Sequence, residues 1–331
     1  MKTILIPIYQ GAVAKNILRT DVLKTLLLRG DVRIICLTRF PGRADYYQRE
    51  IFHKRLLYDL FYEIPDGTFE RFFSFLKFRL IRTATTDLWH SMSYDEQRNY
   101  FLYARAVFFN WLIARGSVRK FFRFLDRYLI KDPGFGAVLD KYKPDVILLA
   151  HLFDDVEISL LREAKRKHIP TIGFINSWDK LTARCALRLL PDTLIVFNEI
   201  VKREAMEYAD MPEDKIAVCG IPQYDQYVKD APSSRKEFFE KNGLDPAKHL
   251  LLYSPRGIKF SASDWAMIDF LHECISRGEI PNAQLFARFP PNDFLEEAEL
   301  SRRPWLKYEL PGVRFCSRQD HLIQGAIRSD D

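Results

Sequence analysis

Three features are missing from this 331-residue sequence: a long uncharged apolar run, paired cysteines and a glycine-rich phosphate loop. The longest apolar stretch, residues 100–113, is interrupted by Arg105. It falls short of the roughly 18 residues that a membrane-spanning helix needs. The opening residues, MKTILIPIYQG, lack the apolar core and the cleavage site of a signal peptide. We therefore expect no membrane span and a cytoplasmic location.

The cysteines exclude two further classes of protein. There are five, an odd number, and no two form a C-x-x-C pair. A disulfide framework or a structural zinc site is therefore not expected, and a reducing compartment fits best. The absence of G-x-G-x-x-G likewise argues against a dinucleotide-type phosphate loop.

What is present is the composition of an ordinary globular protein. Apolar residues make up 47% and charged residues 28% of the chain, which argues against general disorder. The length favours two α/β domains over one. A net charge of +6 suits acidic ligands such as nucleotide diphosphates, phosphorylated acceptors or anionic lipid. It is too small to indicate a nucleic-acid partner.

Short apolar runs alternate with amphipathic helical patterns, which predicts an α/β fold with parallel sheets. The expected strands are residues 3–9, 32–37, 146–150, 171–175, 193–197, 216–219, 250–253, 284–287 and 313–316. Residues 45–131 break this rhythm, because they are helical in pattern, aromatic and basic, and we predict a helical insertion there. The polar stretch 229–235 predicts a boundary between an N-terminal domain, 1–230, and a C-terminal domain, 236–331. The latter has about half the strands of a complete doubly wound domain, so we expect it to be incomplete.

Candidate site residues follow the expected strands, because ligands of open α/β sheets bind beyond the carboxyl ends of the strands. In the N-terminal domain these residues are Gln10, Gly11, His151, Asp154, Asn176, Ser177, Trp178, Asp179, Thr182, Gly220 and Tyr224. An imidazole or a carboxylate could act as a general base on an acceptor hydroxyl, and we assign this role to His151, Asp154 and Asp179. An indole can stack on a sugar or a base, while amide and hydroxyl groups bind hydroxyls. A glycine at a helix start lets the backbone approach an anion.

Each of these assignments has a structural alternative. Asp154 or Asp155 could simply cap the following helix. The cluster at residues 176–182 could be a tight turn, and Gly220 with Pro222 could form a rigid turn without contacting a ligand.

Cations follow the strands of the C-terminal domain. Arg256, just after Ser254, lies with Lys259 and Arg288 where a diphosphate would sit. Arginine binds phosphate through two parallel hydrogen bonds, so we predict a donor-phosphate site that includes Gly220, Ser254 and these cations. The alternative is that they are solvated surface side chains.

Residues 98–131 carry eight Lys or Arg against one acid, Asp126. On a helix, Val118, Phe121 and Leu125 share a face, with Arg119 and Arg123 largely opposite. We favour a helix that faces the core and has a solvated basic back. The alternative is an anionic membrane surface as partner, with the protein peripheral on the inner face of the cell membrane. The aromatic residues are not interleaved as stacking platforms, so nucleic acid is not predicted.

Four motifs resemble known transferases. Gly220-Ile-Pro222-x-x-Asp225 resembles the G-x-P-x-x-D element of the CDP-glycerol glycerophosphotransferase and capsule-polysaccharide transferase families, and of relatives related to UDP-N-acetylglucosamine 2-epimerase. Residues 251–255 resemble the strand and proline that open their second domain, and residues 286–290 their R-x-H-P element. Residues 173–182 resemble the G-x-x-x-S-W-D-x-x-T segment of bacterial surface-carbohydrate transferases. Together the resemblance covers residues 140–330.

The resemblance implies two Rossmann-like domains of the GT-B type, with the acceptor on the first and a UDP-, CDP- or GDP-activated donor on the second. It implies a glycosyltransferase without metal or cofactor that acts on a carbohydrate or lipid-linked acceptor in surface polysaccharide biosynthesis, with Arg288 on the donor phosphates. The alternatives are glycerophosphate transfer from a CDP donor, UDP-sugar 2-epimerisation, and a non-catalytic scaffold at the membrane.

The sequence departs from these families in two places. The histidine of the R-x-H-P element is absent, because Pro290 follows Phe289 directly. The families also continue past the position of Asp330 into a strand and a Ser/Thr-rich loop that grips the donor phosphates. We therefore expect an incomplete donor site.

Overall fold

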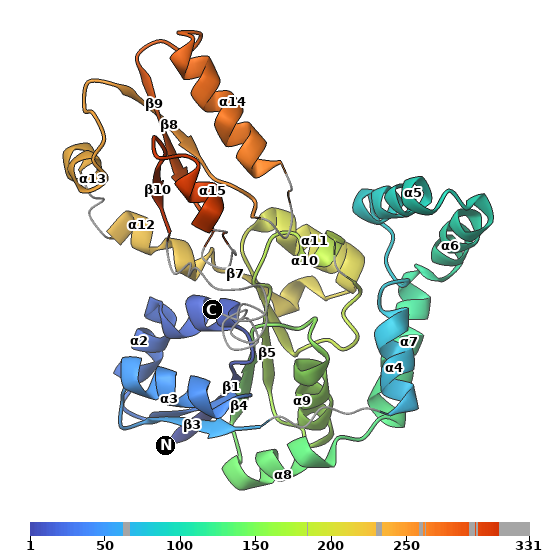
Figure 1. Cartoon of the computed structure of the whole chain (residues 1–331). Helices are drawn as coiled ribbons and strands as arrows, with labels where there is room; N and C mark the ends of the chain where they lie inside the picture. Colours follow the sequence, from blue (N-terminus) through green and yellow to red (C-terminus); the bar gives the residue numbers. More distant parts are fainter. Residues whose placement is uncertain are drawn as a thin grey trace. The chain divides into compact units, whose positions relative to one another are not determined.

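The computed structural model shows an α/β chain of two compact units, Met1–Asp225 and Gln226–Asp331 (Figure 1). Each unit has its own sheet, and every strand pair in both is parallel, so the predicted α/β class is confirmed. The structure describes residues 1–61, 67–183, 185–229, 234–257, 261, 263–290, 295 and 297–310. The expected strand at 313–316, the following helix and the predicted phosphate contact Lys259 lie outside the described residues.

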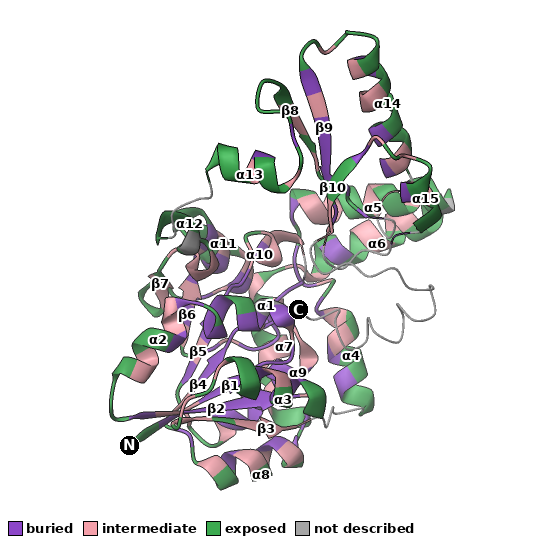
Figure 2. Ribbon diagram, turned by 60° about the vertical axis from the view of Figure 1, so that its left-hand side comes forward, coloured by how far each residue is buried: buried purple, intermediate pink, exposed green. Residues whose placement is uncertain are grey.

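The sheet of the first unit has seven strands in the order β3-β2-β1-β4-β5-β6-β7. They are β1 Lys2–Pro7, β2 Val32–Thr38, β3 Leu56–Leu60, β4 Val146–Leu149, β5 Thr171–Phe174, β6 Thr193–Val196 and β7 Ile216–Val218. Successive side chains of a strand point to opposite faces of the sheet, so adjacent residues of one strand belong to different apolar clusters. Leu5 and Ile147 belong to one apolar cluster, and Ile6 and Leu148 to the other. Both faces of the central strands are therefore covered, as Figure 2 shows by the buried residues of β1, β2 and β4.

Helices connect the strands of this sheet. They are α1 Gly11–Val13, the π-helical η1 Ala14–Leu18, α2 Asp21–Leu28, α3 Pro41–Glu50, α8 Pro133–Tyr142, α9 Asp155–Arg166, α10 Lys180–Ala183, α11 Glu199–Ala209, and the 3-10 turns η2 Glu213–Lys215 and η3 Pro222–Tyr224. Glycine at position 173 of β5 has a packing reason. A Cβ there would lie 2.5 Å from a methyl carbon of Leu152 and 2.7 Å from Cγ of Pro191.

The predicted helical insertion lies between β3 and α8. Its helices are α4 Thr68–Leu76, α5 Ala84–Gln97, α6 Tyr100–Ile113 and α7 Gly116–Leu129. The prediction that residues 45–131 are helical throughout is wrong at β3, which pairs with β2 in register Ile34↔Leu56. This short strand is only partly buried at the sheet edge and directly precedes the aromatic helical pattern, so its periodicity was masked.

The predicted orientation of α7 is wrong in part, although its Val118 and Phe122 do pack against the apolar cluster of Leu80 and Ile81. Its buried side chains are Arg119 and Asp126, whereas Phe121 and Phe124 are exposed. The arginines point inward because Asp210, at the end of α11, accepts from Arg119 Nη2 at 2.7 Å and from Arg123 Nη1 at 2.6 Å. Burial by itself would raise the pKa of Asp210, but these two arginines hold it below its usual value.

The second unit contains a three-stranded sheet in the order β10-β9-β8. Its elements are α12 Gln226–Lys229, α13 Arg235–Lys241, β8 His249–Tyr253, α14 Asp264–Ser276, β9 Ala283–Arg288, α15 Glu297–Ser301 and β10 Lys307–Glu309. Ile268 of α14 packs with Leu285 and Ala287 of β9 in one core. The strand β10 was not predicted, because three residues that are exposed or half-buried carry no recognisable periodicity.

Candidate active site at the carboxyl ends of the first sheet

The order of the first sheet reverses between β1 and β4. The chain leaves β1 towards β2 and leaves β4 towards β5, although β1 and β4 are hydrogen-bonded neighbours. In open parallel sheets such a reversal opens a crevice beyond the carboxyl ends of the two strands. The loops after β1 and β4 meet there, because Gln10 Nε2 donates to Asp154 Oδ2 at 3.1 Å.

Asp154 caps α9 and also ties these two loops together. Its Oδ1 accepts from the backbone N–H of Val156 at 2.9 Å, while Oδ2 accepts from Gln10. The neighbouring Asp155 pairs with Lys77 at 2.7 Å. Since both oxygens of Asp154 are engaged, His151 is the better candidate for a general base.

His151 faces the loop after β5. Its Nε2 lies 3.3 Å from Nζ of Lys180, the first residue of α10. An ammonium group can only donate. A hydrogen bond here therefore requires a neutral imidazole ring whose Nε2 accepts from Lys180 Nζ. Lys180 was not predicted from the sequence, because a lysine at a helix start has no distinctive pattern.

The β5 loop places an aromatic ring beside a buried amide. Asn176 is only 9% exposed, yet within the described residues its side chain has no hydrogen-bond partner. Trp178 is 73% exposed, and the Ser177 hydroxyl donates to the Asp179 carboxylate. An open indole next to an unpartnered amide can stack on a ring and bind its hydroxyls. Thr182, further along, accepts through its carbonyl from Thr83 Oγ1 at 2.7 Å.

The loop after β7 returns towards the loop after β1. Gly220 adopts a φ of +80°, which favours glycine, and its N–H donates to the carbonyl of Phe197 at 3.1 Å. A phosphate would have to displace that bond to reach this N–H. The turn η3 then packs against η1, and its Tyr224 is half exposed.

Glu157 is a buried acid beneath this site that was not predicted from the sequence. It is 1% exposed, and its Oε2 accepts from the His151 backbone N–H at 2.8 Å. Within the described part of the chain, its Oε1 and the Tyr9 hydroxyl have no hydrogen-bond partner. Burial raises the pKa of Glu157 well above its usual range. The His151 N–H acts against that shift, and Asp154 adds to it. The spacing from Asp154 to Glu157 matches a capping box, which predicts only a bond back to the cap residue.

Replacing Glu157 with glutamine should remove a pH-dependent loss of stability. A carboxyl whose pKa is raised on folding stabilises the folded state below its unfolded pKa, and this contribution is lost as the pH rises towards the folded pKa. Glutamine keeps the acceptor for His151 but cannot ionise. Relative to the wild type, the variant should therefore gain on the order of 1 kcal/mol or more between about pH 5 and about pH 8.

Urea denaturation at the two pH values measures this difference. The exposed Glu96 of α5 provides the control, because Glu96→Gln should leave the pH dependence unchanged. A constant difference between Glu157→Gln and the wild type at both pH values would show that Glu157 is ionised in the folded protein.

Cations mark the carboxyl ends of β8 and β9 in the second unit. Ser254 and Arg256 are exposed after β8, and Arg288 ends β9 with 58% of its side chain exposed. The Arg288 Nε lies 3.2 Å from Glu309 Oε2 on β10. An exposed pair of this kind contributes about 1 kcal/mol or less, so a doubly charged anion can compete for the guanidinium.

The loop between β8 and α14 is held by Asp264. This residue is 8% exposed and accepts from the Tyr253 hydroxyl at 2.8 Å and from the Gly257 N–H at 3.0 Å. Burial, followed by the bond to Asp264, raises the pKa of Tyr253 to about 12. Gly257 has a φ of +90°, a conformation that favours glycine.

No described helix is both long and apolar enough to cross a bilayer. No group of three or more His, Cys, Asp or Glu among the described residues is arranged to hold a metal ion.

No family model and no curated protein matches this sequence. Among solved structures, UDP-GlcNAc 2-epimerase from Methanocaldococcus jannaschii has a TM-score of 0.46 at 12% identity, covering 98% of this chain and 76% of its own. The 2-epimerase from Neisseria meningitidis, bound to UDP-GlcNAc, has a TM-score of 0.47 at 12% identity over 94% and 72%. A glycosyltransferase from Rickettsia africae has a TM-score of 0.47 at 12% identity over 97% and 70%. The chain is thus similar in structure to both UDP-GlcNAc 2-epimerases and glycosyltransferases.

Proposed function

We propose that this chain is a GT-B-type glycosyltransferase that moves a sugar from a nucleotide-sugar donor to a carbohydrate or lipid-linked acceptor, in the biosynthesis of surface polysaccharide. One observation carries the proposal. At the carboxyl edge of β4 and β5, the His151 imidazole lies against Lys180, in the loop that also holds the unpartnered amide of Asn176 and the open indole of Trp178.

These groups match the needs of glycosyl transfer. The acceptor oxygen must lose a proton as it bonds to the anomeric carbon, and the bond from that carbon to the nucleoside diphosphate breaks. His151 would take this proton at Nε2, with the acceptor hydroxyl replacing Lys180 Nζ as the donor to that nitrogen, while Trp178 and Asn176 would hold the acceptor ring and its hydroxyls. In the second unit, Arg256 and Arg288 would bind the diphosphate, which favours both its binding and its departure.

Loss of Arg288 should weaken the binding of a nucleoside diphosphate about tenfold or more, the usual effect of removing a charge-assisted hydrogen bond. Calorimetric titration of wild type and Arg288→Ala with UDP, CDP and GDP tests this. Arg277→Ala is the matched control. Arg277 is also exposed and ion-paired, with Glu273, but it lies after α14 and before β9, away from the carboxyl edge.

The nucleotide preference separates the alternatives. Binding of GDP supports sugar transfer, binding of UDP supports sugar transfer or 2-epimerisation, and binding of CDP alone would point to a glycerophosphotransferase. If none of the three nucleotides gave heat, or if the two arginine variants lost the same affinity, the donor site proposed here would be wrong.

A further inference from the structure

In α6 and α7 of the insertion the fully buried side chains are polar, and large apolar side chains are exposed. In α6, Asn110 is the one buried residue, and its amide donates to the carbonyls of Arg79 at 3.0 Å and Ile81 at 2.7 Å. Phe101 is 73% exposed and Phe108 58% exposed. The surface of α6 that meets solvent is therefore apolar, the reverse of an ordinary surface helix.

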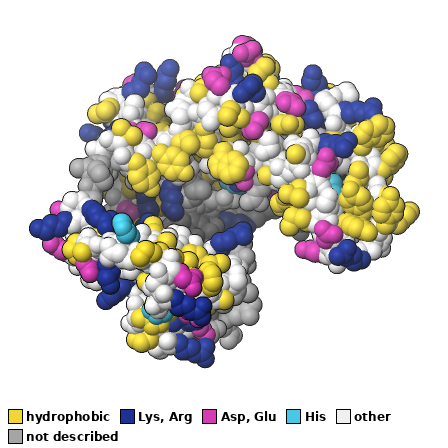
Figure 3. All heavy atoms as spheres, turned by 90° about the horizontal axis from the view of Figure 1, so that it is seen from above, with side chains coloured by type: hydrophobic (Ala, Val, Ile, Leu, Met, Phe, Trp, Pro, Cys, Tyr) yellow, Lys and Arg dark blue, Asp and Glu magenta, His cyan; other side chains and the backbone are white. Residues whose placement is uncertain are grey.

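The neighbouring helices repeat this inversion. The buried residues of α7 are Arg119 and Asp126, while Phe124 is exposed. No described side chain of α5 is buried, and Trp89 is 61% exposed. Figure 2 shows α5 and α6 mostly in the colours of intermediate and exposed residues, and on the right of Figure 3 hydrophobic side chains gather with Lys and Arg among them.

An apolar surface of this extent needs an apolar partner. Helices that are apolar on all sides are normally buried in a protein core or in lipid, and monomeric proteins in water rarely expose large contiguous apolar patches. The combination of Trp and Tyr with Lys and Arg is typical of side chains at a membrane–water interface. Trp89, Tyr100 and Trp111 are all more than half exposed.

The charge of this surface indicates what kind of apolar partner it binds. Residues 98–131 hold eight Lys or Arg and one acid. That acid, Asp126, is buried and pairs with Arg162, and Arg119 and Arg123 point inward to Asp210, so six of the eight cations remain to charge the surface. The excess positive charge would repel another copy of this segment and attract an anionic surface.

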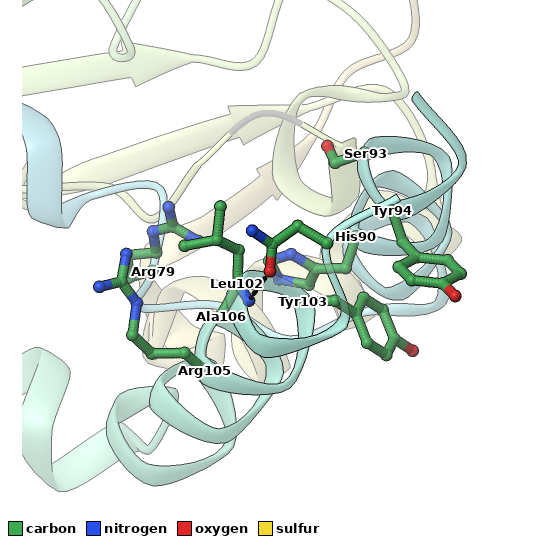
Figure 4. A pocket seen from close by; sticks show the side chains of 9 residues that line it. Arg79, His90, Ser93, Tyr94, Leu102, Tyr103, Arg105 and Ala106 are labelled. Carbon is green, nitrogen blue, oxygen red and sulfur yellow. Dashed lines mark hydrogen bonds between the residues drawn. The ribbon is translucent and has the colours of Figure 1, made fainter. Parts of the chain in front are cut away.

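A pocket between α5 and α6 concentrates the same charge. It has a volume of about 240 Å³ and is lined by Arg79, His90, Tyr94, Tyr103 and Arg105, among others, with no acid in its wall (Figure 4). In Figure 4 the two arginines lie at one end and the two tyrosines at the other. Within the described part of the chain, neither arginine forms an ion pair. Burial, and then the charge of Arg79, lowers the pKa of His90, as expected in a positive pocket.

We infer that α4–α7 dock on an anionic phospholipid bilayer, with their exposed aromatic side chains in the interface and a lipid phosphate in the pocket between α5 and α6. The guanidinium groups of Arg79 and Arg105 would bind the phosphate at their end of the pocket, away from the hydroxyls of Tyr94 and Tyr103. This inference is independent of the proposed transferase activity, because it uses no residue of the candidate active site.

Co-sedimentation of the full chain with vesicles tests the inference. The protein should bind vesicles of phosphatidylcholine mixed with phosphatidylglycerol, and bind much less to phosphatidylcholine alone. Phe101→Ser combined with Phe108→Ser should lower the partition coefficient about tenfold or more, because these apolar side chains would otherwise enter the interface. Leu28→Ser is the matched control, since Leu28 is 84% exposed but lies on α2, outside the insertion.

The pocket is tested with Arg105→Ala, which should weaken vesicle binding about fivefold. Arg29→Ala, at an exposed arginine after α2, should leave it unchanged. Circular dichroism and nucleotide calorimetry must match the wild type for each variant, so that failure of this inference stays distinct from failure of the transferase proposal.

Three results would overturn the inference. Equal binding to neutral and anionic vesicles would remove the role of charge. Arg105-dependent binding of free glycerol phosphate without any vesicle binding would make the pocket a site for a small phosphate. A dimer in light scattering that Phe101→Ser with Phe108→Ser dissociates would assign the apolar surface to a second copy of the chain.

Discussion

Replacing Arg162 with methionine is expected to destabilise the first unit by about 3–5 kcal/mol, the usual cost of leaving buried charges without their partner. Arg162 is 0% exposed at the centre of α9. Its guanidinium donates to Asp126 Oδ1 at 2.7 Å and to Glu70 Oε2 at 3.2 Å, and it also binds Asp132. These three carboxylates come from α7, from α4 and from the N-cap of α8, so one side chain of α9 holds three segments.

A second arginine shares the same carboxylates. Arg188 donates through Nε to Asp126 Oδ2 at 2.7 Å, and it also binds Glu70 and Asp155. Because Arg188 remains in the variant, Asp126 and Glu70 would each keep one cation, whereas Asp132 would lose its ion pair. Burial already raises the pKa of Asp132 against the opposing effect of Arg162. We therefore expect Asp132 to take up a proton in the variant, which would limit the loss to the range given.

Urea denaturation, followed by circular dichroism, measures the effect. Arg203→Met on α11 is the control. Arg203 is exposed, so its replacement should change the free energy of unfolding by about 0.5 kcal/mol or less. Arg162→Lys should fall between the two, because an ammonium group keeps the charge but cannot bind all three carboxylates in the planar geometry of arginine. Equal midpoints for Arg162→Met and Arg203→Met would show that the buried pairs contribute little.

This network links the insertion to the candidate active site through α9. The same helix that pairs with α4 and α7 through Arg162 begins at the Asp154 cap and carries Glu157 in its first turn. A change that loosens the insertion is therefore expected to disturb the loop between β4 and α9. That loop is where His151 lies.

The sequence predicted the sheet of the first unit well, except at its edge. The strands that begin at Val146 and Thr171 are buried on both faces, so their apolar composition alone predicts them. The orientation of α7 could not be predicted in the same way. Periodicity shows which residues share a helix face, but only the partner decides which face is inside. The partner of Arg119 is Asp210, 91 residues further along the chain.

The positions of several candidate site residues were predicted from the sequence, but the contacts between them were not. Placement after parallel strands was enough to select Gln10, His151 and Asn176, because strand ends meet at one edge of the sheet. Lys180 and Glu157 were missed since their importance depends on distances to His151 that no local pattern encodes. The assigned roles of all these residues stay predictions until they are tested by substitution.

Loss of His151 is expected to lower kcat for sugar transfer about 10²–10⁴-fold, the usual contribution of a general base. The substitution His151→Ala removes the imidazole but leaves the backbone N–H that donates to Glu157. The substrate is the nucleotide-sugar whose nucleotide binds in calorimetry. The affinity for that nucleotide should not change, because the cations assigned to it, Arg256 and Arg288, are in the other unit.

Replacing a histidine that has only a structural role would not lower kcat while leaving the nucleotide affinity unchanged. A matched control is His168→Asn, at an exposed histidine between α9 and β5, where a φ of +55° suits asparagine. It should leave both kcat and nucleotide affinity unchanged. If His151→Ala lost activity only in proportion to a loss of folded protein, or kept the activity of His168→Asn, then His151 would not be the base. Asp179, on the adjacent loop with its carboxylate held by Ser177, would be the remaining candidate from the sequence.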